Sequence, residues 1–341
     1  MPPPVDFSAP EEELPASVNA PAAPTIPQDL VLFCPLCPGD TVLMTAVVRD
    51  LHRAHPGRFR TAVRTGTMEL WQHNPYITPE PELVNPRQIF WMWSSTGAGY
   101  HPRHLIDIWS QSLASKLRVR IPLTQIKGDI YLTDAEKSEI PPPLQGEKGP
   151  FWIVMAGGKR DTETKWWPTE NYQAVVSHFA GKIKFIQCGL LARTHHHKPL
   201  AGVINCVGKT TPRQLVQLIY HADGVLAPIT FATHLAAAIP TRPGKPNLRA
   251  AVVIGGGREP AHIYQYPGHQ VLHTVGALPC SADGPCWKSH LLPRKGSDAT
   301  NCLRPVQTEA GPFAQCMTLI TPARAIAAIE SYYQGGALSY L

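Results

Sequence analysis

One acidic residue stands where α/β sheets commonly bind their ligands. An apolar run at residues 30–33 predicts a buried strand, and a proline-rich turn containing Gly39 and Asp40 follows it. A helix comes next, because apolar residues fall on one helical face: Leu43, Ala46, Val47 and Leu51. Ligands bind outside the carboxyl ends of strands in open α/β sheets, so Asp40 is a candidate reactive carboxylate. The alternative is that Asp40 only caps the helix, a common role for Asp.

Four of the eight cysteines lie close together near the end of the chain, at Cys280, Cys286, Cys302 and Cys316. Four thiolates suit a tetrahedral zinc or a mononuclear iron ion. The spacing lacks short Cys-x-x-Cys pairs, and four unrelated buried cysteines remain the alternative. We expect a structural metal that staples a segment too polar to bury a core of its own. Cys34 and Cys37 have no second pair beside them, and we interpret them as packing residues.

The elements that position these residues form two α/β halves. In the first half we expect strands at residues 30–33, 59–63 and 88–93 and a helix at 104–117. In the second half we expect strands at 151–155, 183–186, 224–227 and 250–254, with helices at 170–179, 212–221 and 233–238. A proline- and glycine-rich stretch at 140–149 separates them. This alternation predicts two doubly wound parallel sheets facing across a cleft.

The predicted organisation has five parts. Residues 1–28 form a flexible tail rich in Pro and Ala, 29–145 the first α/β domain and 150–275 the second. Residues 276–320 form the cysteine segment, and 321–341 a final helix and tail. Thr321 as N-cap, Pro322 in the first turn and Gly335 past the end are typical helix boundaries.

Composition limits the class of protein. Hydrophobic content of 43%, charged content of 16% and 341 residues indicate a globular protein with substantial cores. No apolar run approaches the ~18–20 residues of a membrane span, and residues 1–28 lack the layout of a secretion signal. We therefore expect a cytoplasmic protein. The net charge of +6 suits an anionic ligand such as a sugar nucleotide and leaves DNA open as a partner.

Three motifs in order resemble one family. They are Gly39-Asp40 with the downstream Asn74-Pro75, the run Lys165-Trp-Trp-Pro-x-Glu-Asn-Tyr, and the run Thr233-His-Leu-Ala-Ala-Ala. The chain resembles glycosyltransferases of the ADP-heptose:lipopolysaccharide heptosyltransferase type, over roughly residues 30–254. The resemblance implies the GT-B arrangement of two Rossmann-like domains, with the acceptor on the first and the donor on the second. Protein-modifying relatives, the autotransporter heptosyltransferases, resemble the chain in their four-cysteine metal site.

The resemblance assigns roles to two charged residues. Asp40 matches the catalytic aspartate, which takes the proton of the acceptor hydroxyl while the nucleotide diphosphate leaves from the opposite face. Lys165 matches the lysine that binds phosphate, and its ammonium stabilises the charge that grows on the leaving group. The other interpretation of Lys165 is an exposed lysine before two core tryptophans.

The resemblance also assigns the donor site. Residues 230–234 correspond to the loop and helix N-terminus that hold the diphosphate: Thr230, Phe231, Ala232, Thr233 and His234. This chain departs from the family's Asp-Thr-Gly at residues 229–231, and His234 is as well explained by packing. Gly157, Gly158 and Lys159 end a strand and allow a ligand to approach the backbone, and Gln187 is a candidate for the nucleobase pocket. We interpret His195, His196 and His197 as a solvated loop.

The predicted activity is therefore inverting transfer of a heptose, or a related sugar, from an ADP-linked donor to a hydroxyl. No catalytic metal is expected, because GT-B enzymes stabilise the leaving group with protein donors. The acceptor is macromolecular, either a protein, the lipopolysaccharide core or modified DNA. The altered loop at residues 229–231 keeps an alternative open, a non-catalytic scaffold on a GT-B fold. The sequence leaves the oligomeric state undetermined.

Overall fold

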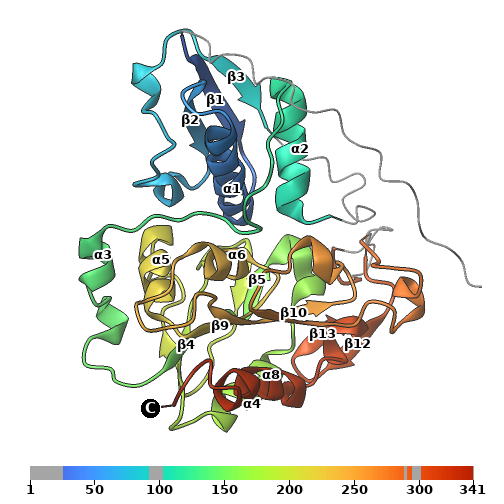
Figure 1. Ribbon diagram of the computed structural model, residues 1–341. Helices are drawn as coiled ribbons and strands as arrows, with labels where there is room; N and C mark the ends of the chain where they lie inside the picture. The colour runs from blue at the N-terminus through green and yellow to red at the C-terminus, as the bar shows by residue number, and fades with distance from the viewer. Residues whose placement is uncertain (1–25, 92–102, 288–289, 294–300, 341) are drawn as a thin grey trace, which may run out of the picture.

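The computed structural model describes residues 26–91, 103–287, 290–293 and 301–340. Figure 1 shows two lobes, each built on a parallel sheet. The upper lobe contains the following strands and helices: β1 (Gln28–Cys34), α1 (Pro38–Ala54), β2 (Phe59–Thr65), η1 (Met68–Trp71), η2 (Glu80–Glu82), β3 (Arg87–Phe90) and α2 (Leu105–Leu117). The tail at 1–25 and residues 92–93 of the third expected strand lie outside the described residues.

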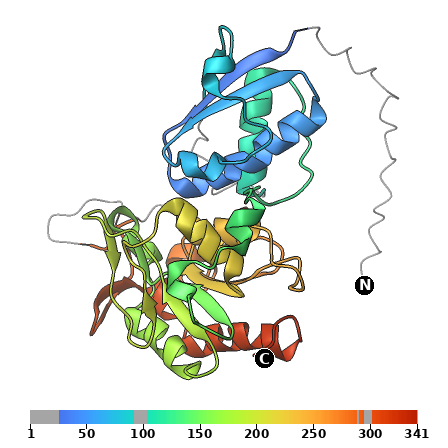
Figure 2. The same cartoon turned by 90° about the vertical axis from the view of Figure 1, so that its left-hand side faces the viewer.

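The lower lobe holds a six-stranded sheet with helices on both faces, as Figures 1 and 2 show. Its strands are β4 (Phe151–Val154), β6 (Lys184–Gln187), β8 (Ile204–Asn205), β9 (Gly224–Pro228), β10 (Ala250–Gly256) and β11 (His269–His273). Its principal helices are α3 (Asp134–Ser138), α4 (Thr169–His178), α5 (Pro212–His221), α6 (Phe231–Ala238), α7 (Gln315–Thr318) and α8 (Pro322–Gln334). Every strand pair of the sheet is parallel.

Alternating residues of these strands face two separate cores. Ile153, Val225 and Val253 pack with α5 and α6, whereas Trp152 and Leu226 pack with α4 and α8. Because successive side chains of a strand point to opposite faces, both faces are apolar and both are covered. The strand order β8-β6-β4-β9-β10-β11 reverses direction between β4 and β9. This is a Rossmann order, so the prediction of a doubly wound sheet is confirmed for this lobe.

The upper lobe is built on a smaller sheet. Its sheet has three described strands in the order β2-β1-β3, and α1 and α2 share one core with Leu30 and Leu32 on a single face. On the opposite face, Phe33 and Phe90 are exposed and their rings lie 5.3 Å apart. Both strand pairs are parallel, and β2 and β3 lie on opposite sides of β1, so the expected α/β lobe with a parallel sheet is found.

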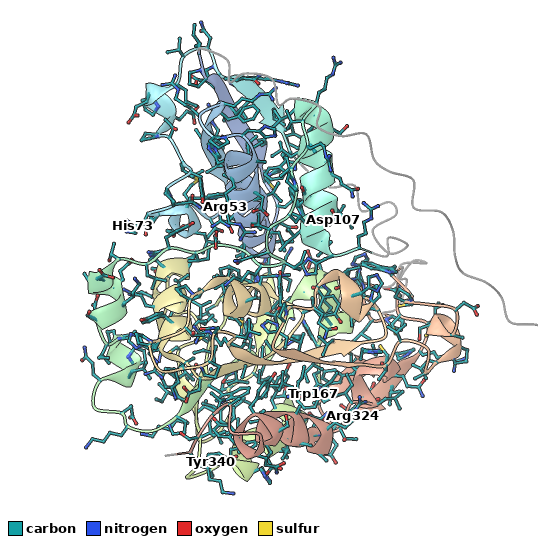
Figure 3. All side chains as sticks on the ribbon, viewed as in Figure 1. Arg53, His73, Asp107, Trp167, Arg324 and Tyr340 are labelled. Carbon is teal, nitrogen blue, oxygen red and sulfur yellow. The ribbon has the colours of Figure 1, made fainter. Side chains whose placement is uncertain are left out.

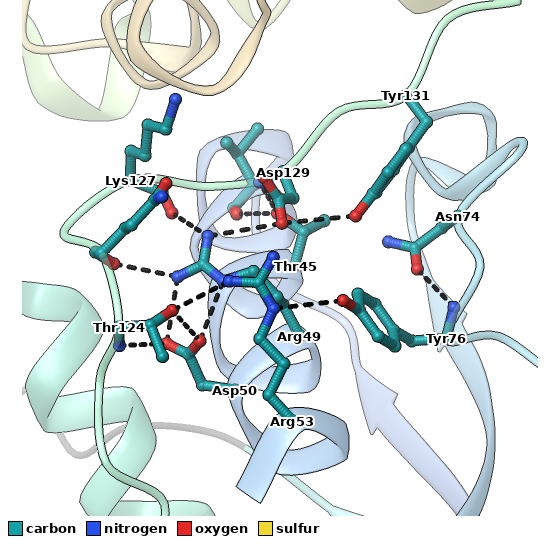
Figure 4. Close-up of polar contacts among 12 residues, drawn as sticks. Thr45, Arg49, Asp50, Arg53, Asn74, Tyr76, Thr124, Lys127, Asp129 and Tyr131 are labelled. Carbon is teal, nitrogen blue, oxygen red and sulfur yellow. Dashed lines mark hydrogen bonds and ion pairs between the residues drawn. The ribbon is translucent and has the colours of Figure 1, made fainter. Parts of the chain in front are cut away.

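A buried polar network fastens the chain between the lobes to α1. Figure 4 shows Arg49 at its centre, fully buried and paired with Asp50 at 2.9 Å. Arg49 also donates to the carbonyl oxygens of Lys127 and Gln125, each at 3.0 Å. Asp50 accepts from the backbone N–H of Thr124 at 3.1 Å. The connection that follows α2 is therefore held in place before it enters the lower lobe.

The lobes contact each other through α1 and α6. A side chain on Gly128 of the connection would meet Val42 of α1 and Ala238 of α6, which shows how closely the three segments pack. Val42 belongs to the same apolar core as α5 and α6. The interface between the lobes is therefore partly apolar.

The three histidines at 195–197 do not form a loop as expected. They form β7 (His195–His197), which pairs antiparallel with β5 (Gly157–Lys159). Gly157 has φ of 140°, and a Cβ at this position would lie 1.9 Å from the carbonyl oxygen of His196. The glycine is required because another strand passes here, which the sequence pattern alone does not reveal.

The remaining elements close the lower lobe. They are η4 (Pro142–Leu144), η5 (Arg160–Lys165), η6 (Ala261–Ile263), η7 (Pro279–Ser281) and the hairpin β12 (Pro305–Thr308) and β13 (Gly311–Ala314). Trp167 is buried and donates to the carbonyl oxygen of Ile320 at 2.7 Å; Figure 3 shows it inside the lower lobe. Thr321 caps α8 by accepting from Arg324 N–H, as predicted. Within the described part of the chain, no helix has the length and hydropathy of a membrane span.

Candidate functional site

The reversal of strand order places two turns side by side. Residues 155–158 follow β4 and residues 229–231 follow β9, and the two strands are neighbours in the sheet. Open α/β sheets bind ligands in the crevice outside the carboxyl ends of strands at such a switch point. Two of the predicted donor segments therefore meet at one edge of the sheet, although they are far apart in sequence.

The first turn of α6 begins at this edge. Thr230 is its N-cap and makes no side-chain capping bond to the helix. Thr230 and Phe231 are partly exposed, whereas Ala232 and Thr233 are buried. Thr233 uses its hydroxyl to donate to the carbonyl oxygen of Thr230 at 2.7 Å. The groups that remain accessible are the Thr230 side chain and the first backbone N–H groups, which suit an oxyanion.

Asp40 lies in the first turn of α1, and Cys37 is the N-cap of that helix. The interpretation of Asp40 as the helix cap is therefore wrong. Asp40 is half-buried. A Cβ on the neighbouring Gly39 would lie 3.0 Å from Cδ2 of His234 and 3.9 Å from Cα of Phe231. The turn that carries Asp40 thus packs directly against the first turn of α6.

Lys165 ends η5, and its ammonium lies 2.7 Å from Oε1 of Glu259. Glu259 also pairs with Arg258. Burial on its own raises the pKa of Glu259, but the charges of Lys165 and Arg258 outweigh it and hold that pKa below the ordinary value. Glu259 is therefore an ionised, buried carboxylate, and Lys165 is not the isolated surface lysine of the alternative interpretation.

His234 takes a packing role in this structure. Its Nδ1 lies 2.6 Å from the hydroxyl of Tyr266, and the two rings meet edge to face. Tyr266 also contacts the ring of His104 from the upper lobe. Burial, with His104 and Lys165 nearby, lowers the pKa of His234 to about 3, so its imidazole is neutral at pH 7. A neutral ring at the lobe contact can still offer one N–H group.

Two of the predicted ligand residues already have partners inside the protein. Gln187 is fully buried, and its amide donates to the carbonyl oxygen of Lys198 while accepting from Leu200 N–H. Both ends of the amide therefore hold the following loop. Lys159 lies 2.8 Å from Asp161 and 3.7 Å from the sulfur of Cys37. Cys37 is exposed and contacts the other lobe, so only Cys34 of that pair is a packing residue.

The four clustered cysteines line one small cavity, with Gly257 and Arg258 beside them. Burial, together with the other three thiols nearby, raises the pKa of Cys316 to about 11. Like charges close together oppose ionisation, so the four sulfurs are mutual neighbours. Among the described residues, however, no group of His, Cys, Asp or Glu side chains is arranged as a set of metal ligands. The four cysteines line the same cavity, but their sulfurs are not arranged around a common point as metal ligands would be.

A cavity of about 310 Å³ lies beside this segment, lined by Trp166, His196 and Phe313 among others. The rings of Trp166 and His196 stack with centroids 4.9 Å apart. Gly157 reaches its wall, so the cavity borders the β4 turn. We had no expectation for it from the sequence.

Sequence reasoning missed Arg258, Glu259 and Tyr266. Arg258 and Glu259 directly follow the glycines that end β10, so the rule that selected Asp40 also selects them. Tyr266 carries no such signal, because its contact with His234 and His104 depends on how the lobes meet.

The fold and site define a protein of two nucleotide-type lobes, with a helix N-terminus and a lysine at the switch point of the second. The sequence model of glycosyltransferase family 9 (heptosyltransferase) matches residues 101–243. No curated protein matches the chain. The family match and the shared fold described next support a glycosyltransferase enzyme.

Solved structures share this fold at low sequence identity. The glycosyltransferase family 9 protein of Veillonella parvula is 12% identical, covers 92% of this chain and 100% of its own, and has a TM-score of 0.60. ADP-heptose LPS heptosyltransferase II of E. coli is 12% identical, with 91% and 100% covered and a TM-score of 0.58. TibC of enterotoxigenic E. coli, an iron-containing dodecameric glycosyltransferase, is 16% identical, with 91% and 77% covered and a TM-score of 0.61.

Proposed function

We propose that this chain transfers a heptose, or a related sugar, from an ADP-linked donor to a hydroxyl group of a macromolecule, with inversion. The observation that carries the proposal is the meeting of α1 and α6: the turn with Asp40 packs against the helix N-terminus at the switch point. The family match and a TibC structure in complex with ADP-D-beta-D-heptose support the choice of donor.

In this proposal each residue has a separate task. Asp40 accepts the proton of the incoming hydroxyl, which makes the oxygen a better nucleophile. Lys165 and the backbone N–H groups at the start of α6 hold the diphosphate as its negative charge increases. Stabilisation that grows as the glycosidic bond breaks accelerates the reaction rather than only tightening donor binding.

Calorimetric titration with ADP-heptose, ADP and UDP tests the proposal. We expect binding of the adenine nucleotides and, for Lys165→Met, a loss of ADP affinity of about tenfold or more. A protein that binds none of these nucleotides would support the scaffold alternative instead. The acceptor, whether a protein, the lipopolysaccharide core or modified DNA, is identified by mass spectrometry of each candidate after incubation with the donor.

We also propose a structural zinc or iron ion at Cys280, Cys286, Cys302 and Cys316. The convergence of the four sulfurs on one cavity supports it, as does the iron content stated for TibC. A bound cation would offset the repulsion among thiolates and tie η7, the β12–β13 hairpin and α7 together. Elemental analysis of protein purified without added ions tests this. We expect about one zinc or iron per chain, and the absence of both would discard the site.

A further inference from the structure

Lys165, the cation proposed to hold the donor's diphosphate, already has an anionic partner. Its ammonium lies 2.7 Å from Oε1 of Glu259, a charge-assisted hydrogen bond. The Lys165 side chain is 22% exposed and that of Glu259 only 9%, so an anion from solvent can approach the lysine more easily than the glutamate. A diphosphate that binds Lys165 must therefore share or replace an interaction made inside the protein.

Glu259 is held independently of Lys165. Arg258 pairs with it, and the Arg258 guanidinium lies 2.9 Å from Nδ1 of His290 and 3.4 Å from the carbonyl oxygen of Trp287. The backbone is fixed as well, because Trp287 N–H donates to the Arg258 carbonyl oxygen at 3.1 Å. A buried carboxylate without a partner costs several kcal/mol. Arg258 removes that cost, so Glu259 stays paired when Lys165 turns to another anion.

The ion pair spans the place where the diphosphate is expected. Lys165 lies in the segment that follows β4, and Glu259 follows β10; β9, which feeds α6, lies between these two strands. His234 lies in the first turn of α6, and the charges of both Lys165 and Glu259 affect its pKa. A carboxylate on this rim competes with a bound diphosphate for the same ammonium.

We propose that Glu259 is the counter-ion that a nucleoside diphosphate displaces from Lys165, and that it thereby weakens the binding of ADP and speeds its release. This rests on the proposed function, which places the diphosphate at Lys165. Glu259 is a positioning residue in this role, because it acts on the ligand through the lysine. Its carboxylate holds the ammonium in the empty site and returns to it after the product leaves.

The direction in which one substitution changes ADP affinity tests the proposal. Glu259→Gln keeps the shape and removes the charge, so we expect it to bind ADP about tenfold more tightly than the wild type. The dissociation rate of ADP, measured by stopped flow, should fall by a similar factor. A residue that only supports the local structure would give weaker binding when replaced. Thermal melting confirms that the variant folds, and Glu259→Asp, with a carboxylate withdrawn from Lys165, provides a milder second variant.

Asp223 offers a matched control. It is also a buried carboxylate between a lysine and an arginine, 3.0 Å from Lys245 and 3.3 Å from Arg242. It precedes β9, at the opposite end of the same sheet. Asp223→Asn should therefore leave the ADP affinity unchanged within about twofold.

Repeating the titration in Lys165→Met separates the possible outcomes. If Glu259 acts through Lys165, Glu259→Gln should change ADP affinity by less than about twofold in that background. Equal tightening with and without Lys165 would overturn the proposal, as would weaker or unchanged binding in the single variant. A wild-type protein that binds no ADP would refute the proposed function and this inference together.

Discussion

The two ends of the six-stranded sheet are built from similar charged residues but differ in what surrounds them. At the carboxyl end, Glu259 lies with Lys165 and Arg258 beside a helix N-terminus. At the amino end, Asp223 lies with Lys245 and Arg242. A buried acid between two cations therefore does not define a site. The carboxyl end adds the start of a helix, α6, and a turn from the other lobe.

The amino end satisfies its own backbone instead. Arg249 is buried and donates to the carbonyl oxygens of Ala222 and Pro240, the latter at 2.8 Å. These carbonyls close the ends of α5 and α6, where helices leave acceptors without partners. Burial lowers the pKa of Arg249 to about 9, yet the side chain still has three carbonyl oxygens within reach. We therefore expect substitutions at the carboxyl end of the sheet to change catalysis or nucleotide binding, and substitutions at the amino end to change stability.

The largest effect is expected at the turn of the upper lobe that meets the carboxyl end. Asp40→Asn removes the proposed base, so kcat/KM for sugar transfer should fall by about 10³-fold, within the range for general base catalysis. Binding of the ADP-sugar should change by less than about threefold. Steady-state kinetics and calorimetry measure the two quantities. Asp107→Asn, in α2, serves as the control and should keep the wild-type rate. Transfer at the native rate by Asp40→Asn would exclude Asp40 from the mechanism.

Arg249→Met tests the amino end. Removing the guanidinium leaves buried carbonyl oxygens without donors, and we expect a loss of about 2–4 kcal/mol in the free energy of unfolding. ADP affinity of the folded variant should stay within about twofold of the wild type. Urea unfolding and calorimetry provide the two values. A large loss of affinity with little loss of stability would reverse the roles assigned to the two ends.

The contact between the lobes should contribute to the loss of stability in acid. Burial lowers the pKa of His104 to about 4 and that of His234 to about 3. The unfolded chain binds protons on these groups near pH 6.5. Their stabilisation is therefore complete above pH 6.5 and is lost as pH falls from there towards 4. Between pH 7.5 and 5 we expect a loss of about 1–2 kcal/mol for each histidine.

Urea unfolding of the wild type and of His104→Asn at both pH values measures this loss. Asparagine keeps an acceptor for the N–H of Ile106, which His104 caps. Between pH 7.5 and 5, the free energy of unfolding of the variant should fall by about 1–2 kcal/mol less than that of the wild type, which is the contribution of one histidine. An unchanged dependence would show that protonation of His104 does not limit stability. This pH dependence of stability is expected without any ADP bound.

The smallest effect is predicted for Glu136→Gln, in α3. Glu136 pairs with Arg213, and the hydrogen bond from Arg213 lowers the pKa of Glu136 to about 2. The pair joins α3 to the first turn of α5 rather than to α6 or η5, so we expect a loss of about 1 kcal/mol in stability and no change in ADP affinity. A change in affinity above threefold would show that the nucleotide site extends further than we propose.

Local patterns in the sequence predicted the lower lobe well. The helix at 212–221 is found with those bounds, because Thr211 and Gln214 form a capping box around Pro212. The strands at 224–227 and 250–254 are long apolar runs, and they are confirmed with small extensions. Where apolar periodicity and caps agree, the sequence determines the element.

Long-range contacts account for what the sequence did not reveal. Gly157 looked like a ligand-binding glycine, but it is required by the close approach of His196. Arg49 and Asp50 have the pattern of an exposed helical face, yet both are buried under the connection between the lobes. Glu259 meets Lys165 across a neighbouring strand. Such contacts depend on sheet order, which periodicity within one segment does not encode.

A structure of the protein with bound ADP tests the central claim most directly. We predict that the diphosphate lies between the Lys165 ammonium and the first N–H groups of α6, with Lys165 turned away from Glu259. Diphosphate density elsewhere, for example in the cavity lined by Trp166 and Phe313, with the Lys165–Glu259 pair intact, would contradict it.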